Sequence, residues 1–129
     1  MDWRTWLHEA IQGHPPLISE IPIERWFSAA AFTEKPSEKP FAVVTFGLET
    51  ERITVVRAQT ATIWIYDIPG SFFRIDEILD LLREAIRNHL ISGLGIAAIA
   101  GDAGADTFDQ DMQLITRNLA IEFFARKEE

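Results

Sequence analysis

The chain has 129 residues, a mass of 14.7 kDa, 47% hydrophobic residues and no cysteine. This is the size of one ordinary domain with enough apolar side chains for a core, and the lack of cysteine excludes a disulfide framework or a thiolate metal site. A formal net charge of −8 argues against a protein that reads nucleic-acid sequence, because such proteins carry a basic face for the phosphates.

The N-terminus shows no signal-peptide pattern, and no run approaches the ~18 apolar residues that span a bilayer. We therefore expect a protein made in a cytoplasm, with no membrane partner.

Residues 1–24 are expected to form an N-terminal helix and a connector. Apolar residues repeat at helical spacing from Trp3 to Ile11, and the Gly-His-Pro-Pro run that follows ends this helix. The segment Leu17–Glu24 contains Pro22 and mixes apolar with acidic residues, so it is expected to lie on the body of the domain as a connector.

Residues 25–126 are expected to form a sheet and one long helix. Arg25–Phe32 is a candidate strand, although its three consecutive alanines leave a helix open as the alternative. The charged, proline-punctuated segment Thr33–Pro40 is expected to be an exposed loop. Phe41–Gly47 is a stronger candidate strand. Pro40 at its entry is compatible with this, because proline is tolerated at the first position of a strand.

The next strand follows a predicted turn at Leu48–Arg52 and runs from Ile53 to Tyr66. A strand that is apolar on both faces is either central and covered on both sides, or covered on one side by a partner. Side chains alternate along a strand, which divides its last residues into two faces, Ala61, Ile63 and Ile65 against Trp64 and Tyr66.

A Pro-Gly turn separates this strand from the long helix. Pro69 and Gly70 favour a turn, and Ser71 is a candidate N-cap whose side chain accepts a bond from a free amide. Asp76 lies early enough to interact with the positive end of the helix dipole. Apolar residues at helical spacing predict the buried side of this helix, namely Ile75, Ile78, Leu79, Leu82, Ala85, Ile86 and Leu90. Gly93 is the predicted end of the helix.

Beyond the helix the sequence predicts a short strand at Gly95–Ala100, an acidic loop at Asp102–Asp111 and a half-buried strand that ends at Arg126. The order of elements predicts a single α+β domain over residues 1–129. We expect a mainly antiparallel sheet of four to five strands, with an N-terminal helix and one long central helix packed on it.

Convergent chemistry is not evident in the sequence. The three histidines are not spaced to meet a nucleophile or a second ligand, and the acidic loop fails the EF-hand pattern at Thr107 and Gln113. We therefore predict no enzyme, no cofactor and no metal site. The alternative from another class is a small ligand-binding, ion-binding or hydrolytic domain that uses Asp67, Asp76 and the acidic loop.

The run Ile63–Leu79 contains Tyr-Asp-Ile-Pro-Gly-Ser-Phe-Phe-Arg-Ile-Asp. It resembles the signature of tail terminator proteins of long-tailed, siphovirus-type bacteriophages. In those proteins a strand ends in an aromatic residue or histidine, then Asp, one residue, Pro-Gly, an acidic residue, an aromatic residue and Arg-Ile-Asp. Ser71 and Phe72 stand where relatives often have Asp and Tyr. Three further segments are similar to the family, namely Lys39–Phe41, Asp106–Asp109 and Thr116–Asn118.

The resemblance implies a structural virion protein that forms a homohexameric ring. Such a ring caps the head-proximal end of the tail tube, joins it to the head completion protein, and lets double-stranded DNA pass without specific binding. Another head–tail connector or neck protein is the nearest alternative.

Three groups of residues follow as candidates. For subunit or partner contacts we expect Trp64, Tyr66, Phe72, Phe73 and Phe108. For the turn and the helix start we expect Asp67, Pro69, Gly70, Ser71 and Asp76. For loops that face the lumen or a partner we expect Glu34, Glu38, Glu49 and Glu51.

Overall fold

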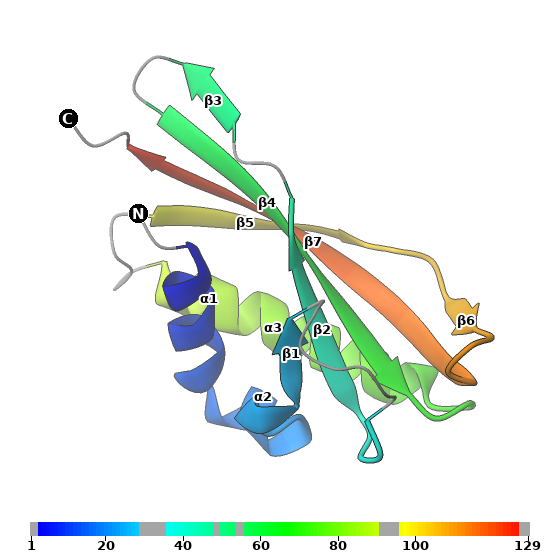
Figure 1. Ribbon diagram of the computed structural model, residues 1–129. Coiled ribbons are helices and arrows are strands. Elements are labelled where there is room, and N and C mark those ends of the chain that lie inside the picture. Colours follow the sequence, from blue (N-terminus) through cyan, green and yellow to red (C-terminus); the bar gives the residue numbers. More distant parts are fainter. Residues whose placement is uncertain (1–2, 29–35, 48–49, 54–55, 91–95, 127–129) are drawn as a thin grey trace.

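A computed structural model describes residues 3–28, 36–47, 50–53, 56–90 and 96–126. Three α-helices, one short 3-10 helix and seven strands follow one another along this part of the chain (Figure 1). In chain order they are α1 (Trp3–Gln12), α2 (Pro15–Glu20), η1 (Ile23–Arg25), β1 (Trp26–Ser28), β2 (Phe41–Phe46), β3 (Thr50–Ile53), β4 (Val56–Asp67), α3 (Phe72–His89), β5 (Ile96–Ala103), β6 (Thr107–Asp109) and β7 (Leu114–Arg126).

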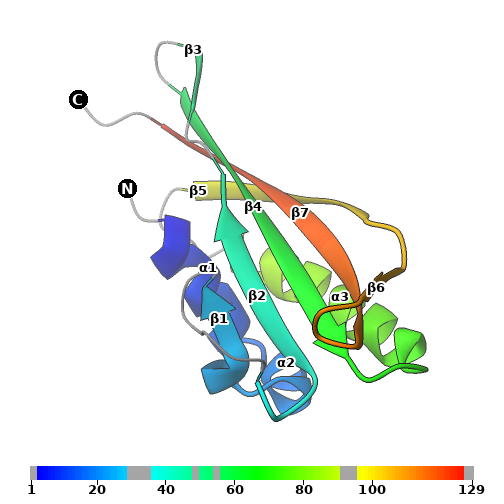
Figure 2. The ribbon, with the colours of Figure 1, turned by 45° about the vertical axis from the view of Figure 1, so that its right-hand side comes forward.

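The strands form one sheet in the order β1-β2-β4-β7-β5, with β3 added to β4 and β6 added to β7. Strand β1 is parallel to β2, and the other described pairings are antiparallel. The two longest strands, β4 and β7, pair along their whole shared length and run diagonally through the twisted sheet (Figure 2). They are the frame to which the shorter strands attach.

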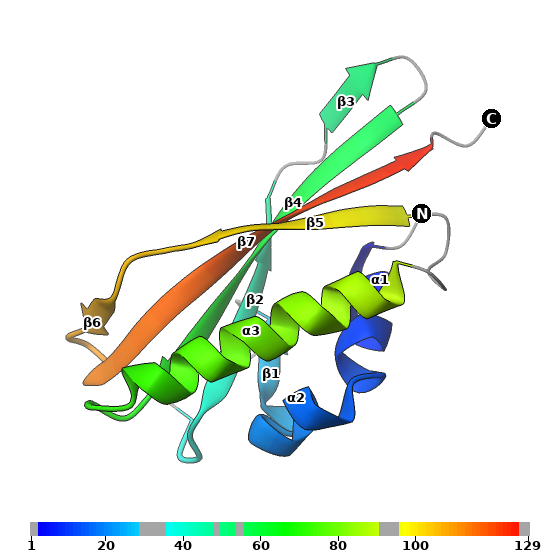
Figure 3. The same cartoon turned by 180° about the vertical axis from the view of Figure 1, so that it is seen from behind.

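Helices cover one face of the sheet, and α3 lies across this face in Figure 3. The main core forms between the helices and the inward side chains of β2, β4, β5 and β7. The inward residues predicted for α1 and β4 are buried, and so are those of α3 up to Ile86. Leu90 is the exception, because it follows the helix and is 41% exposed.

The opposite face of the sheet carries a second, smaller apolar cluster. Phe41, Val43 and Leu114 are buried there, and half-buried Trp64 and Tyr66 pack against them. Strand β4 is therefore central and apolar on both sides, and its two faces divide as the alternation predicts.

The sequence prediction of mixed α and β content, with an N-terminal helix and one long helix, is confirmed. The predicted number of strands is wrong, because the described residues contain seven, and the sheet is mixed because β1 runs parallel to β2. Strand β1 lies within the candidate strand predicted at Arg25–Phe32, whereas β3 and β6 have four and three residues and are too short for an alternating pattern to be recognised.

The prediction of a connector after α1 is also wrong, because part of it forms helix α2. Pro15 and Pro16 begin this helix. Proline fits there because the backbone N–H groups of the first helical turn have no partner within the helix, so their loss breaks no hydrogen bond. Leu17 and Ile21 are fully buried, and Trp26 Nε1 donates a 2.9 Å hydrogen bond to the Ile21 carbonyl oxygen. Packing against α1 and α3 therefore orders a segment whose sequence alone suggests a loop.

Two predicted turns contain strands instead. Strand β3 (Thr50–Ile53) overlaps the turn predicted at Leu48–Arg52. It forms because β4 extends past β2 and offers backbone groups there that need a partner. The predicted acidic loop contains the end of β5 and all of β6, which pairs with β7. The end predicted for α3 at Gly93 lies outside the described residues.

Phe123 is the side chain on which the main core converges. It is fully buried, and its ring lies 5.8 Å from that of Trp3 and 5.6 Å from that of Trp6. We expect Phe123→Ala to lower the free energy of unfolding by about 3–5 kcal/mol in urea titrations, because a large cavity remains. The neighbouring Phe124→Ala is the control, since that half-buried ring points to the other face; equal losses would contradict this account.

Candidate functional site

An ion pair between a buried carboxylate and a partly exposed arginine holds the corner between β4 and α3. Asp67, the last residue of β4, is fully buried, and Arg74 Nε donates a 2.6 Å hydrogen bond to Asp67 Oδ2. Arg74 Nη2 donates to the other carboxylate oxygen, which also accepts a 2.8 Å bond from the Ile68 amide. The hydrogen bond to Asp67 raises the pKa of Arg74 above its ordinary value. Two parallel bonds to one carboxylate fix both distance and orientation.

The predicted Pro-Gly turn lies between these two residues. Gly70 has φ of +93°, a conformation that other residues rarely adopt. Ser71 occupies the N-cap position, but the prediction that its side chain caps the helix is wrong. Its φ of −106° and ψ of 28° depart from the extended geometry of a capping residue, and its carbonyl oxygen instead accepts bonds from the Arg74 and Ile75 amides.

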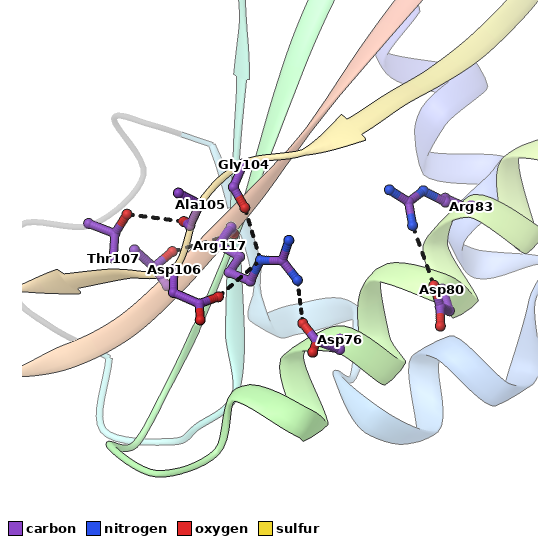
Figure 4. A network of polar contacts seen from close by, with 9 residues as sticks. Asp76, Asp80, Arg83, Gly104, Ala105, Asp106, Thr107 and Arg117 are labelled. Carbon is purple, nitrogen blue, oxygen red and sulfur yellow. Dashed lines mark hydrogen bonds and ion pairs between the residues drawn. The ribbon is translucent and has the colours of Figure 1, made fainter.

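A second arginine connects α3 to the sheet (Figure 4). Arg117 on β7 donates from Nη1 to Asp76 Oδ1 and from Nε to the Gly104 carbonyl oxygen at 2.9 Å. Its Nε also lies 3.3 Å from Asp106 Oδ1. Asp76 lies in the second turn of α3, so its pair with Arg117 links the helix to strand β7. This pairing has no signal in the sequence, because Arg117 lies 41 positions after Asp76.

The four segments that carry the family resemblance lie side by side at this end of the sheet. In the strand register, Phe41 lies opposite Tyr66, and Tyr66 lies opposite Thr116. Thr116 in turn lies opposite Thr107 of β6. One row across four strands thus joins the β2 segment, the end of β4, the Thr-Arg-Asn segment and the acidic segment.

Trp64 and Tyr66 lie in the cluster on the outer face. The Tyr66 ring stacks on Phe41 at 5.1 Å between centroids, and Phe27 meets Phe41 edge-on. Burial raises the pKa of Tyr66 above 10.0, and the negative charge of Asp109 raises it further. Much of the apolar surface of these two predicted contact residues is thus occupied within the subunit.

The remaining predicted contact residues differ in exposure. Phe72 is half-buried and packs on the main core, whereas the adjacent Phe73 is 70% exposed. Phe108 is 47% exposed on β6, at the same end of the molecule as the β4–α3 corner in Figure 3. Ile68 is 49% exposed in the corner itself, and the sequence prediction missed it because a single apolar residue before proline forms no pattern. We call Ile68, Phe73 and Phe108 the end patch.

The acidic residues predicted to face a lumen are only partly described. Glu38 is exposed and lies 3.8 Å from Arg25. Glu51 belongs to β3, although the orientation of its side chain is not described, and Glu34 and Glu49 lie outside the described residues.

The described residues contain no cluster of three or more His, Asp or Glu side chains that could hold a metal ion. Asp76 and Asp106, which the alternative prediction assigns to a ligand or ion site, are both paired with Arg117. In the same described part of the chain, no helix is long and apolar enough to cross a membrane.

Neither a protein-family model nor a curated protein matches the chain. Several solved structures share its fold. One of them, whose name states no function, has a TM-score of 0.50 and 8% sequence identity, over 99% of this chain and 99% of its own length. At that identity the likeness concerns the fold alone.

Loss of the corner ion pair should destabilise the protein. In Arg74→Gln the Asp67 carboxylate stays buried without a cation, so we expect the free energy of unfolding to fall by about 2–4 kcal/mol. This loss is somewhat smaller than for a fully buried pair, because Arg74 is partly exposed. Arg83→Gln, which breaks an exposed pair with Asp80, is the control and should cost less than about 1 kcal/mol. Similar losses in urea titrations of the two variants would refute a special role for the corner.

Tyr66 is the only tyrosine, so phenolate absorbance reports on it alone. We expect its titration midpoint in the folded protein to lie above 10.0. Because the folded-state pKa is raised, the associated stability is fully present below pH about 10 and is lost as the pH rises through the folded pKa. Asp109→Asn should lower the midpoint only in part, since burial is the larger cause. A midpoint equal to that of the urea-unfolded chain would contradict the described burial.

Proposed function

We propose that this protein is a tail terminator of a long-tailed bacteriophage: a structural subunit of a ring that caps the head-proximal end of the tail tube. The observation that carries the proposal is the row Phe41–Tyr66–Thr116–Thr107, which unites the four segments similar to that family. Segments that are scattered in sequence form one structural unit here.

The charged residues of the signature support the same proposal. Asp67 and Arg74 pair with each other, and Asp76 pairs with Arg117 of the Thr-Arg-Asn segment. A chance match would not require these residue types to be mutually complementary in space. The signature therefore describes how the corner between β4 and α3 is held against β7.

Ring formation needs two different surfaces that fit each other, because head-to-tail contacts close into a ring. The end patch offers one apolar surface of this kind, since Phe73 points away from the core on a helix whose other side is buried. In a homohexamer this patch would dock on another region of the neighbouring subunit.

The proposed partners are the tail tube protein on one face of the ring and the head completion protein on the other, within the virion. Each subunit adds a formal charge of −8, so a ring of them is strongly acidic. Double-stranded DNA passing through the hole would be repelled and would not bind specifically. Another neck component of the same virion is the alternative that shares these features.

Ring assembly can be tested directly with the full chain. We expect native mass spectrometry and negative-stain microscopy to find closed rings, whose assembly Phe73→Ser weakens by about tenfold or more, as expected for a central apolar contact. Glu77→Ser, at an exposed position of the same helix, is the control. We also expect the rings to stop polymerisation of the tail tube protein of the same phage. A chain that stays monomeric at high concentration and leaves tube growth unchanged would refute the proposal.

A further inference from the structure

A groove lies between helix α1 and strands β1 and β2, and we call it the α1–β2 groove. Its volume is about 210 Å³. Most of its lining is apolar, namely Leu7, Ile11, Ile23, Trp26, Val44 and Phe46. The Phe46 ring also stacks against the fully buried Phe123, with 6.1 Å between the ring centroids. Part of the groove is thus an extension of the main core that reaches the surface.

The α1–β2 groove offers a positive charge beside this apolar surface. Its described lining includes Arg4 and a histidine but no carboxylate. The Arg4 guanidinium lies 4.3 Å from the centre of an aromatic ring of the groove, and in the described part of the chain no carboxylate pairs with it. Glu9, on the same helix, lies outside the lining and 3.6 Å from His89 of α3. Near the rim, Glu24 and Arg25 carry opposite charges. An apolar group with acidic neighbours therefore fits the groove.

The end patch has this complementary character. Phe73 is 70% exposed, so its ring protrudes from the subunit. The two segments that carry the patch, residues 67–77 and 106–117, each contain three carboxylates and one arginine. Both arginines are already paired with aspartates. Asp109 and Asp111, beside Phe108, have no arginine partner among the described residues. The end patch is therefore apolar and its surroundings are acidic.

The two surfaces lie at opposite ends of α3. Phe73 is in the first turn of this helix, whereas His89, its last residue, contacts α1. Since an α-helix rises about 1.5 Å per residue, these two positions are about 24 Å apart. The groove is also at the β1 edge of the sheet, whereas β6 pairs with β7 on the other side of β4 (Figure 1). One subunit can therefore use both surfaces at once, with a different neighbour at each.

We propose that the end patch of one subunit docks into the α1–β2 groove of the next subunit. Phe73 enters the groove, and the acidic residues beside Phe108 face Arg4. This inference rests on the proposed ring function and names the surface that receives the end patch. The contact joins two different surfaces, so it repeats head-to-tail until the ring closes. The opposite charges at its rim set the register of the two apolar surfaces.

The lack of cysteine allows a direct test with the full chain. Ser28 lines the groove and Glu77 lies one turn from Phe73, and both are exposed, so a cysteine at either position leaves the apolar contact intact. We expect the double variant Ser28→Cys, Glu77→Cys to give a ladder of covalent oligomers with a short bismaleimide reagent. The matched control combines Glu77→Cys with Ile99→Cys on the exposed edge strand β5, and it should give no ladder.

The charge of Arg4 provides an independent measurement. Arg4→Glu should weaken ring assembly by about tenfold at low salt, because like charges then face each other at every contact. Adding Asp111→Arg to this variant should restore assembly. Arg87→Glu, the same reversal at an exposed position of α3, is the control and should leave assembly unchanged. Thermal melts show that each variant is folded.

The outcomes separate this contact from the ring function. Rings that give no ladder through positions 28 and 77, or that give one through positions 77 and 99, would overturn this contact and leave the ring function standing. A ladder through positions 28 and 77 in a protein that does not stop tube growth would support the contact and remove the proposed function. A chain that stays monomeric would overturn both.

Discussion

The ion pair of the buried Asp67 with Arg74 is the constraint on which the rest of the structure depends. Strand β4 organises the sheet, since β2, β3 and β7 all pair with it, and α3 covers the sheet's inner face. A carboxylate removed from water needs a partner, so the corner is stable only where the first turn of α3 places Arg74 beside Asp67. This requirement sets where the helix begins and how it meets the strand.

The same logic separates structural charge from functional charge at this end of the molecule. Asp67, Asp76 and Asp106 are each engaged by an arginine, so the carboxylates that suggest acid–base or ion chemistry in the sequence are tied to the fold. The exposed groups that remain there are large and apolar, the end patch of Ile68, Phe73 and Phe108. Exposed apolar side chains of this kind are typical of interaction surfaces, which agrees with the proposed subunit contact.

Periodic patterns explain how much of the fold could be predicted. The buried sides of α1, α3 and β4 follow from spacing alone, because each element is long enough to repeat its pattern. Strands β3 and β6 and helix α2 are short and depend on neighbours for burial and pairing, so their sequences suggest turns and loops. For the candidate site, the Pro-Gly corner was predictable, but the contacts of Arg117 were not, since they join residues far apart in the chain.

The placement of the apolar surface also bears on where the proposed subunit contact would lie. The inner face of the sheet is covered by helices, and the outer aromatic cluster is largely satisfied by its own stacking, with Phe41 fully buried between Phe27 and Tyr66. Among the described residues, the large apolar side chains that stay exposed are those of the end patch together with Leu90 and Ile99. In the proposed ring a head-to-tail contact would use the end patch, because such a contact needs apolar surface that the subunit's own core leaves uncovered.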